Sequence, residues 1–103
     1  MKRQIRKSVA QQIVETVKDV SGHDINFIDP NGIIFASTDQ GRVGAFHEIG
    51  RQVVNTGETI EAEMDDSFFG TQKGVNLPFV YQGEVIAATG ISGVPDEVQS
   101  LPI

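Results

Sequence analysis

The residues best suited to chemistry lie in the segment 37–48, which reads STDQGRVGAFHE. Arg42 lies between two glycines, and His47 stands at the start of a stretch with helical spacing. The amino-terminal end of a helix attracts carboxylate or phosphate through its dipole and its unpaired N–H groups. Arg42 can add a bidentate pair of donors, and His47 can donate from either ring nitrogen. The segment therefore predicts an anion-binding site.

One other interpretation of this segment stays open, whereas a zinc site is not expected. Arg42 can pair with Asp39 at the surface while His47 only caps local structure, and exposed ion pairs of this kind contribute little to stability. A zinc site would need a second histidine four residues after His47, but position 51 is arginine. We therefore expect no metal and no cofactor.

Two further segments carry polar side chains next to predicted strands. The first places Lys73, Gly74 and Asn76 where a glycine-rich loop enters a strand, and the second ends the last strand with Thr89 and Ser92. Glycines there allow the backbone to approach a bound molecule, although each pattern alone is also typical of an exposed loop or a strand exit. No nucleophile beside a base and no cofactor motif accompanies them, so we expect recognition of a ligand rather than catalysis.

Helices and strands in a mixed order must position these residues. The stretch from Ile5 to Val20 carries apolar residues at steps of three and four, which predicts an amphipathic helix whose stripe packs on a sheet or on a second copy of the chain. The further elements expected are strands at 25–29 and 33–37, a helix from Phe46 to Asn55, an edge strand at 59–63, strands at 75–81 and 84–91, and a helix from Val94. Pro78 indicates a free edge or a bulge in its strand. This order predicts an α+β fold with an antiparallel sheet and helices to one side.

Composition narrows the function classes. The 103 residues fit one domain spanning 1–103. The net charge is -6, and four of the eight basic residues lie within the first seven positions, namely Lys2, Arg3, Arg6 and Lys7. The acidic remainder argues against nucleic acid as a partner for the body of the chain, because such binding needs several phosphate contacts. No apolar run approaches the roughly 18 residues of a membrane span, so we expect a cytoplasmic chain.

Several separated segments occur in an order that is informative as a set. They are Ala10–Val14, Asn26–Ile34, Ser37–Asp39, Arg42–Gly44, His47–Glu48, Gly74–Pro78 and Gly90–Gly93. Together they resemble the sugar diacid recognition domain at the amino terminus of carbohydrate diacid regulators, a family of bacterial transcription factors. The resemblance implies a PAS-like fold, in which a five-stranded antiparallel sheet with flanking helices encloses a small carboxylate.

The resemblance also implies roles for the residues singled out above. Arg42, His47 and the amides of the following turn would hold one carboxylate. Lys73, Gly74 and Asn76 would reach the other end of the ligand or its hydroxyls, and Thr89 and Ser92 would line the floor. A small hydroxy acid such as glycerate is an alternative ligand, and a PAS-type dimerisation module without a physiological ligand is an alternative function. A full regulator would continue past Val98 to a helix-turn-helix that contacts DNA, and the sensor would act as a homodimer.

Overall fold

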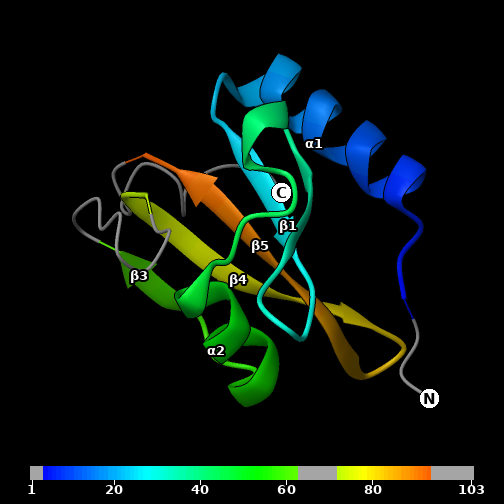
Figure 1. Ribbon diagram of the computed structural model, residues 1–103, viewed down its shortest axis with the longest axis vertical. Coiled ribbons are helices and arrows are strands. Elements are labelled where there is room, and N and C mark those ends of the chain that lie inside the picture. The colour runs from blue at the N-terminus through cyan, green and yellow to red at the C-terminus, as the bar shows by residue number, and fades with distance from the viewer. Residues whose placement is uncertain (1–3, 63–71, 94–103) are drawn as a thin grey trace.

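A computed structural model describes residues 4–62 and 72–93 of the chain (Figure 1). Two helices and five strands follow one another with a single 3-10 turn between them. In chain order they are α1 (Lys7–Ser21), β1 (Ile25–Ile28), β2 (Ile34–Ser37), η1 (Gln40–Arg42), α2 (Glu48–Thr56), β3 (Ile60–Ala62), β4 (Gly74–Tyr81) and β5 (Glu84–Ser92). The helix predicted from Val94 lies outside the described residues.

The five strands form one sheet in the order β2-β1-β5-β4-β3, and every neighbouring pair is antiparallel. This confirms the predicted PAS-like α+β fold. The two hairpins, β1–β2 and β4–β5, are joined through the pairing of β1 with β5 (Figure 1). None of the helices in residues 4–62 and 72–93 is long and apolar enough to cross a bilayer.

The two helices cover opposite faces of the sheet, which corrects the expectation that they share one side. Ala10 and Val14 of α1 are fully buried against a cluster that includes Phe27 and Ala87. Val53 and Val54 of α2 belong to a second cluster with Ile28, Ile34 and Ala88. Because neighbouring residues of a strand point to opposite faces, Ala87 and Ala88 of β5 place the two clusters on opposite sides.

The buried face of α1 is rotated from the stripe read in the sequence. Ala10 and Val14 are its buried residues, while Ile13 and Val17 are only partly buried against the core. Val9 is 41% exposed and Val20 is 75% exposed. The apolar stripe is therefore wider than the sheet can cover, and part of it faces outward.

The two hairpins explain the positions of Asp29 and Pro78 in the sequence. The Asp29 carboxylate accepts hydrogen bonds from the backbone N–H groups of Asn31 (2.9 Å) and Ile33 (3.0 Å), so it stabilises the β1–β2 turn. Pro78 pairs with Ala88 of β5, whereas β3 pairs with β4 over Gly74–Asn76. Among the described residues Pro78 thus lies beyond the end of β3, on the free edge that its missing N–H requires.

Helix α2 begins later than predicted and lies very close to the sheet. Phe46 precedes the helix and is 46% exposed, and His47 is the N-cap. Gly50 is buried, and a Cβ atom there would lie 2.9 Å from three side-chain carbons of Ile28, one of them the branched Cβ itself. Glycine is therefore required at this position by close packing rather than by backbone conformation.

Replacing Gly50 with alanine tests this close approach. Alanine favours a helix interior over glycine by about 1 kcal/mol, but crowding a packed core costs about 1–3 kcal/mol. We expect Gly50→Ala to lower the free energy of unfolding by about 1 kcal/mol in urea titrations. Asn55→Ala, at an exposed position of the same helix, should leave it unchanged or raise it slightly. A stabilised Gly50→Ala variant would contradict the packing described here.

Candidate ligand-binding site

A small polar pocket lies on the face of the sheet that carries α2. Its volume is about 10 Å³, which is room for roughly one water molecule. The residues that line it are Asn26, Arg42, His47, Gln72, Gly74, Asn76, Gly90, Ile91 and Ser92. Five of the seven predicted site residues, Arg42, His47, Gly74, Asn76 and Ser92, are therefore brought together.

The floor of the pocket is a row of three paired strand residues. Gly90 of β5 lies opposite Asn26 of β1 on one side and Asn76 of β4 on the other. Asn26 and Asn76 are both buried, at 7% and 2% exposure. A Cβ atom at Gly90 would lie 3.0 Å from the Asn76 Oδ1 atom. The glycine thus leaves a gap between two buried side-chain amides.

The Asn76 amide presents its oxygen to this gap. Its nitrogen donates to the Ile60 carbonyl oxygen of β3 at 3.3 Å, which directs the opposite end of the amide toward Gly90. Gly74 begins the same strand so close to β5 that a Cβ atom there would overlap the carbonyl oxygen of Ile91. Both residues therefore shape the pocket from β4, one by supplying an acceptor and one by lacking a side chain.

Arg42 reaches the pocket from η1, the 3-10 turn after β2. The hydrogen-bond partners of the Asn26 amide fix its orientation: the oxygen accepts from Arg42 Nη1 at 2.8 Å, and the nitrogen donates to Ser37 Oγ at 2.6 Å. Burial lowers the pKa of Arg42 from its usual value, while the charges of Asp39 and Asp24 oppose this. The guanidinium is thus a half-buried cation that donates to the Asn26 amide oxygen.

The alternative pairing of Arg42 with Asp39 is only partly realised. The Asp39 carboxylate caps η1 by accepting from the Gly41 N–H at 3.0 Å. Its effect on Arg42 is through charge, which raises the pKa of the guanidinium. Arg42 is thus not a simple surface ion pair.

His47 is a neutral donor at the start of α2. Its side chain is buried, with 2% exposure, and Nδ1 accepts from the Gly50 N–H at 2.8 Å. That bond assigns the proton to Nε2. No described residue accepts a hydrogen bond from Nε2, and His47 lines the pocket. Burial, and secondarily the charge of Arg42, lower the pKa of His47 to about 4.

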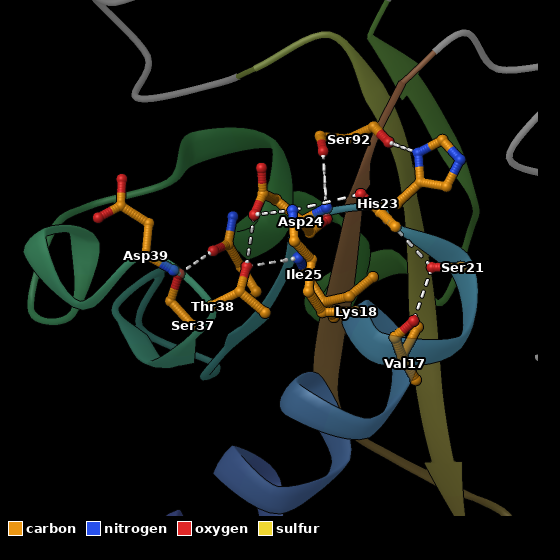
Figure 2. Close-up of polar contacts among 12 residues, drawn as sticks. Val17, Lys18, Ser21, His23, Asp24, Ile25, Ser37, Thr38, Asp39 and Ser92 are labelled. Atoms are coloured by element: carbon orange, nitrogen blue, oxygen red, sulfur yellow. Dashed lines mark hydrogen bonds and ion pairs between the residues drawn. The ribbon is translucent and has the colours of Figure 1, made fainter.

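Ser92 is held in a network at the edge of the pocket (Figure 2). Its Oγ accepts from the Asp24 N–H at 3.1 Å, and its carbonyl oxygen lies 2.7 Å from His23 Nδ1. The Asp24 carboxylate also accepts from Thr38 Oγ1 at 2.9 Å and from Lys18 Nζ at 3.1 Å. The bond from Lys18 is the main reason that the pKa of Asp24 is lowered. The hydroxyl of Ser92 thus joins β5 to the start of β1.

Thr89 and Lys73 do not line the pocket. Thr89 lies opposite Phe27 and Leu77 in the sheet, and directly opposed residues share a face. Phe27 belongs to the cluster under α1, so Thr89 faces away from the pocket. Lys73 is exposed beside the lining residues Gln72 and Gly74, and its carbonyl oxygen accepts from the Gly93 N–H at 2.9 Å.

Comparison with known proteins assigns this sequence to a family. The sequence model of the sugar diacid recognition family matches residues 5–102. The chain belongs to the sugar diacid recognition family. It is 30% identical over 95 residues to the carbohydrate diacid regulator of Escherichia coli K12, covering 88% of this chain and 24% of the regulator. A Haemophilus influenzae protein is 33% identical over 101 residues, covering 93% of this chain and 27% of that protein. The chain thus spans about a quarter of the length of these relatives.

Solved structures show the same fold in proteins of different activity. The sensor domain of the Vibrio cholerae histidine kinase DctB superposes with a TM-score of 0.62 at 18% identity, over 90% of this chain and 39% of that one. A type II free methionine-R-sulfoxide reductase from Thermoplasma acidophilum gives a TM-score of 0.60 at 17% identity, over 89% of this chain and 77% of the reductase. The function of this sugar diacid recognition domain must therefore be argued from its side chains.

The pocket residues that were not among the predicted site residues of this domain are Asn26, Gln72, Gly90 and Ile91. Asn26 matters most, because it contacts Arg42 directly. It interrupts the apolar run Ile25–Ile28, in which every residue is buried. A buried amide must find hydrogen-bond partners, and Asn26 finds them in Arg42 and Ser37. A polar residue inside an otherwise apolar strand is the signal that marks it.

The low pKa of His47 predicts an acid-sensitive fold. Because the pKa falls from 6.5 to about 4 on folding, the neutral form is favoured in the folded state. The associated stability is fully present above pH 6.5 and is lost as the pH falls toward 4. It amounts to on the order of 3 kcal/mol.

Urea titrations between pH 7.5 and 4.5 would measure this loss. His47→Asn keeps a side-chain acceptor for the helix cap but has no titrating group. We expect the variant to be less stable at pH 7.5 and to lose much less stability on acidification. Equal pH dependence in the two proteins would rule out His47 as the source.

Proposed function

We propose that this chain is the ligand-sensing domain of a bacterial transcriptional regulator and binds a sugar diacid or a small hydroxy-carboxylate. The observation that carries the proposal is the convergence of Arg42 and His47 on a pocket whose floor is formed by two amides. Charge-assisted hydrogen bonds are the strong ones, and Arg42 supplies them for a carboxylate. His47 Nε2 adds a neutral donor, and Asn76 Oδ1 adds an acceptor suited to a ligand hydroxyl.

The chemistry of the site favours binding over transformation. Nδ1 of His47 is engaged by the Gly50 N–H, and the low pKa keeps Nε2 as a donor without a positive charge. A general base needs a free acceptor nitrogen within reach of the substrate, which this tautomer lacks. We therefore propose recognition without turnover, even though a reductase has a related fold.

The size of the pocket links binding to signalling. About 10 Å³ accommodates one water molecule, whereas small-molecule sites usually measure about 300–1,000 Å³. A diacid would therefore bind a state in which the side chains around the pocket have moved apart. A ligand with different affinity for two states shifts the balance between them, which is what a sensor requires.

The remaining parts of the proposal concern the ends of the ligand and the parent protein. We propose that the exposed Lys73 reaches the second carboxylate from its place beside Gly74. We also propose that residues 1–103 form one domain of a longer cytoplasmic regulator. Contact with DNA would belong to a helix-turn-helix elsewhere in that regulator, since the chain spans about a quarter of its regulator relative.

A thermal-shift titration with glucarate, galactarate, glycerate, citrate, malate and neutral sugars tests the ligand class. A ligand at 100 times its dissociation constant adds about 2.7 kcal/mol to stability, so Tm should rise by several degrees with hydroxy-carboxylates alone. We expect Arg42→Gln to abolish the rise. Arg51→Gln removes a cation that is instead paired with Glu48 at the surface, and it should retain the rise. An unchanged rise in Tm in Arg42→Gln would show that the proposed site is wrong.

A second candidate function, dimerisation, is favoured by the outward face of α1. Val9 and Ile13 line two surface hollows. One is a groove of about 640 Å³ toward the β4–β5 hairpin, and the other lies along the outer face of α1. The apolar residues that line the groove are Ile5, Val9, Ile13, Phe79, Tyr81 and Ile86. Arg6 and Lys7 lie at one end of α1, and Glu15 and Asp19 lie toward the other, where the single cation Lys18 is paired with Asp24. Antiparallel pairing of two α1 helices would bring these opposite charges together, whereas parallel pairing would oppose like charges.

Sedimentation velocity over a range of concentrations tests the dimer. We expect the parent chain to sediment as a dimer and Val9→Asp to sediment as a monomer, because a carboxylate would be buried in the seam. Val43→Asp is the matched control, since Val43 and Val9 are 40% and 41% exposed and Val43 lies in the loop after η1. A parent chain that stays monomeric at high concentration would exclude this surface as a dimer seam.

A further inference from the structure

The side chain of Gln11 joins α1 to the edge strand β2. Its Nε2 donates to the Ser37 carbonyl oxygen at 2.9 Å, and its Oε1 accepts from the Ser37 N–H at 3.1 Å. β2 is the first strand of the sheet order, so this part of its backbone has a neighbouring strand on one side alone. One glutamine amide thus takes both backbone groups of an edge residue, as a paired strand would.

Ser37 connects this contact to the pocket. It is completely buried, and its Oγ accepts from Asn26 Nδ2 at 2.6 Å and from the Asp39 N–H at 3.0 Å. Asn26 in turn accepts from Arg42 Nη1 at 2.8 Å. Gln11 on one face of the sheet is therefore connected to the Arg42 guanidinium on the other through hydrogen bonds to the backbone and to the side chain of Ser37.

The same serine also orders the turn that carries Arg42. The Ser37 carbonyl oxygen accepts from Gln40 Nε2 at 3.0 Å. Asp39, two residues after Ser37, is the N-cap of η1. Ser37 is thus linked to Arg42 both through Asn26 and through the short chain segment between them. A shift of the Ser37 backbone would therefore move both the backbone of Arg42 and its guanidinium group.

We infer that Gln11 is a positioning residue for Arg42 and that it couples the docking of α1 to the affinity of the pocket for a carboxylate. The inference rests on the proposed function, because it assigns to α1 the regulation of that same site. Coupling between two positions is reciprocal. If docked α1 favours binding, then a bound carboxylate favours docked α1 by the same factor.

The exchange Gln11→Met tests the inference because methionine keeps the length and the apolar part of the side chain but forms neither hydrogen bond. We expect it to weaken binding of the acid identified in the thermal-shift screen about tenfold in calorimetric titrations, within the fivefold or greater changes typical of coupled sites. Gln12→Met, at the neighbouring exposed position of α1, should bind as the parent chain does. Gln11→Glu keeps the acceptor for Ser37 N–H but loses the donor, so it should not restore affinity.

A structural role alone is separated from coupling by a double-mutant cycle with Ser37→Ala. This variant removes the Oγ link to Asn26 while leaving the backbone groups that Gln11 binds. The tenfold effect of Gln11→Met should become clearly smaller in the Ser37→Ala background, because only the route through the chain segment remains. If Gln11→Met weakens binding equally in both backgrounds, or in neither, the inference is wrong.

Hydrogen exchange supplies a readout that stability alone would not move. Added carboxylate should slow exchange of the α1 amides in the parent chain and in Gln12→Met, but not in Gln11→Met. Slowing of equal size in all three proteins would overturn the coupling. If Arg42→Gln bound the acid as the parent chain does, the proposed site itself would be wrong. The α1 exchange of Gln11→Met would then still test Gln11 separately.

Discussion

The hydrogen bond from the Gly50 N–H to His47 Nδ1 is the constraint on which the pocket depends. It caps α2, fixes the tautomer of a buried imidazole and leaves the Nε2 proton for the pocket. The backbone of His47 is fixed as well, since its N–H donates to the Gly32 carbonyl oxygen at 2.7 Å. One residue therefore joins the β1–β2 turn, the start of α2 and the pocket. Gly50 completes the arrangement, because only a residue without a side chain lets α2 approach Ile28 this closely.

The electrostatic balance of the pocket follows from this neutral histidine. Arg42 is half buried, and a second positive charge beside it would be costly at low dielectric. Burial of the ring, and secondarily the arginine charge, lower the pKa of His47, which removes that second charge. The pocket thus combines one permanent cation with a neutral donor and buried amides. In a chain of net charge -6, such a site can attract an anion without placing two cations in contact.

The sequence predicted the elements well because their signals are local. Apolar spacing, glycine turns and Pro78 located α1, α2, the two hairpins and the free edge of β4. The faces of the sheet were harder to predict, since they depend on strand register. Thr89 and Ser92 were assigned to one surface although they are three residues apart in one strand, and an odd separation puts side chains on opposite faces. Asn26 was missed for a related reason, because its role appears only when β1 is paired with β2 and β5.

The residues that hold Arg42 and His47 also belong to the two layers that cover the sheet. His47 is the cap of α2, and Asn26 is linked through Ser37 to Gln11 of α1. The pocket measures about 10 Å³, so the proposed hydroxy-carboxylate would need the side chains around it to move apart. On the proposed function, this movement on one face of the sheet would be taken up by α2 directly or by α1 through the buried polar chain. Because buried hydrogen-bonded groups are costly to separate, the half-buried contact between Gln11 and Ser37 would keep α1 docked during this movement, as the reciprocal coupling proposed above requires.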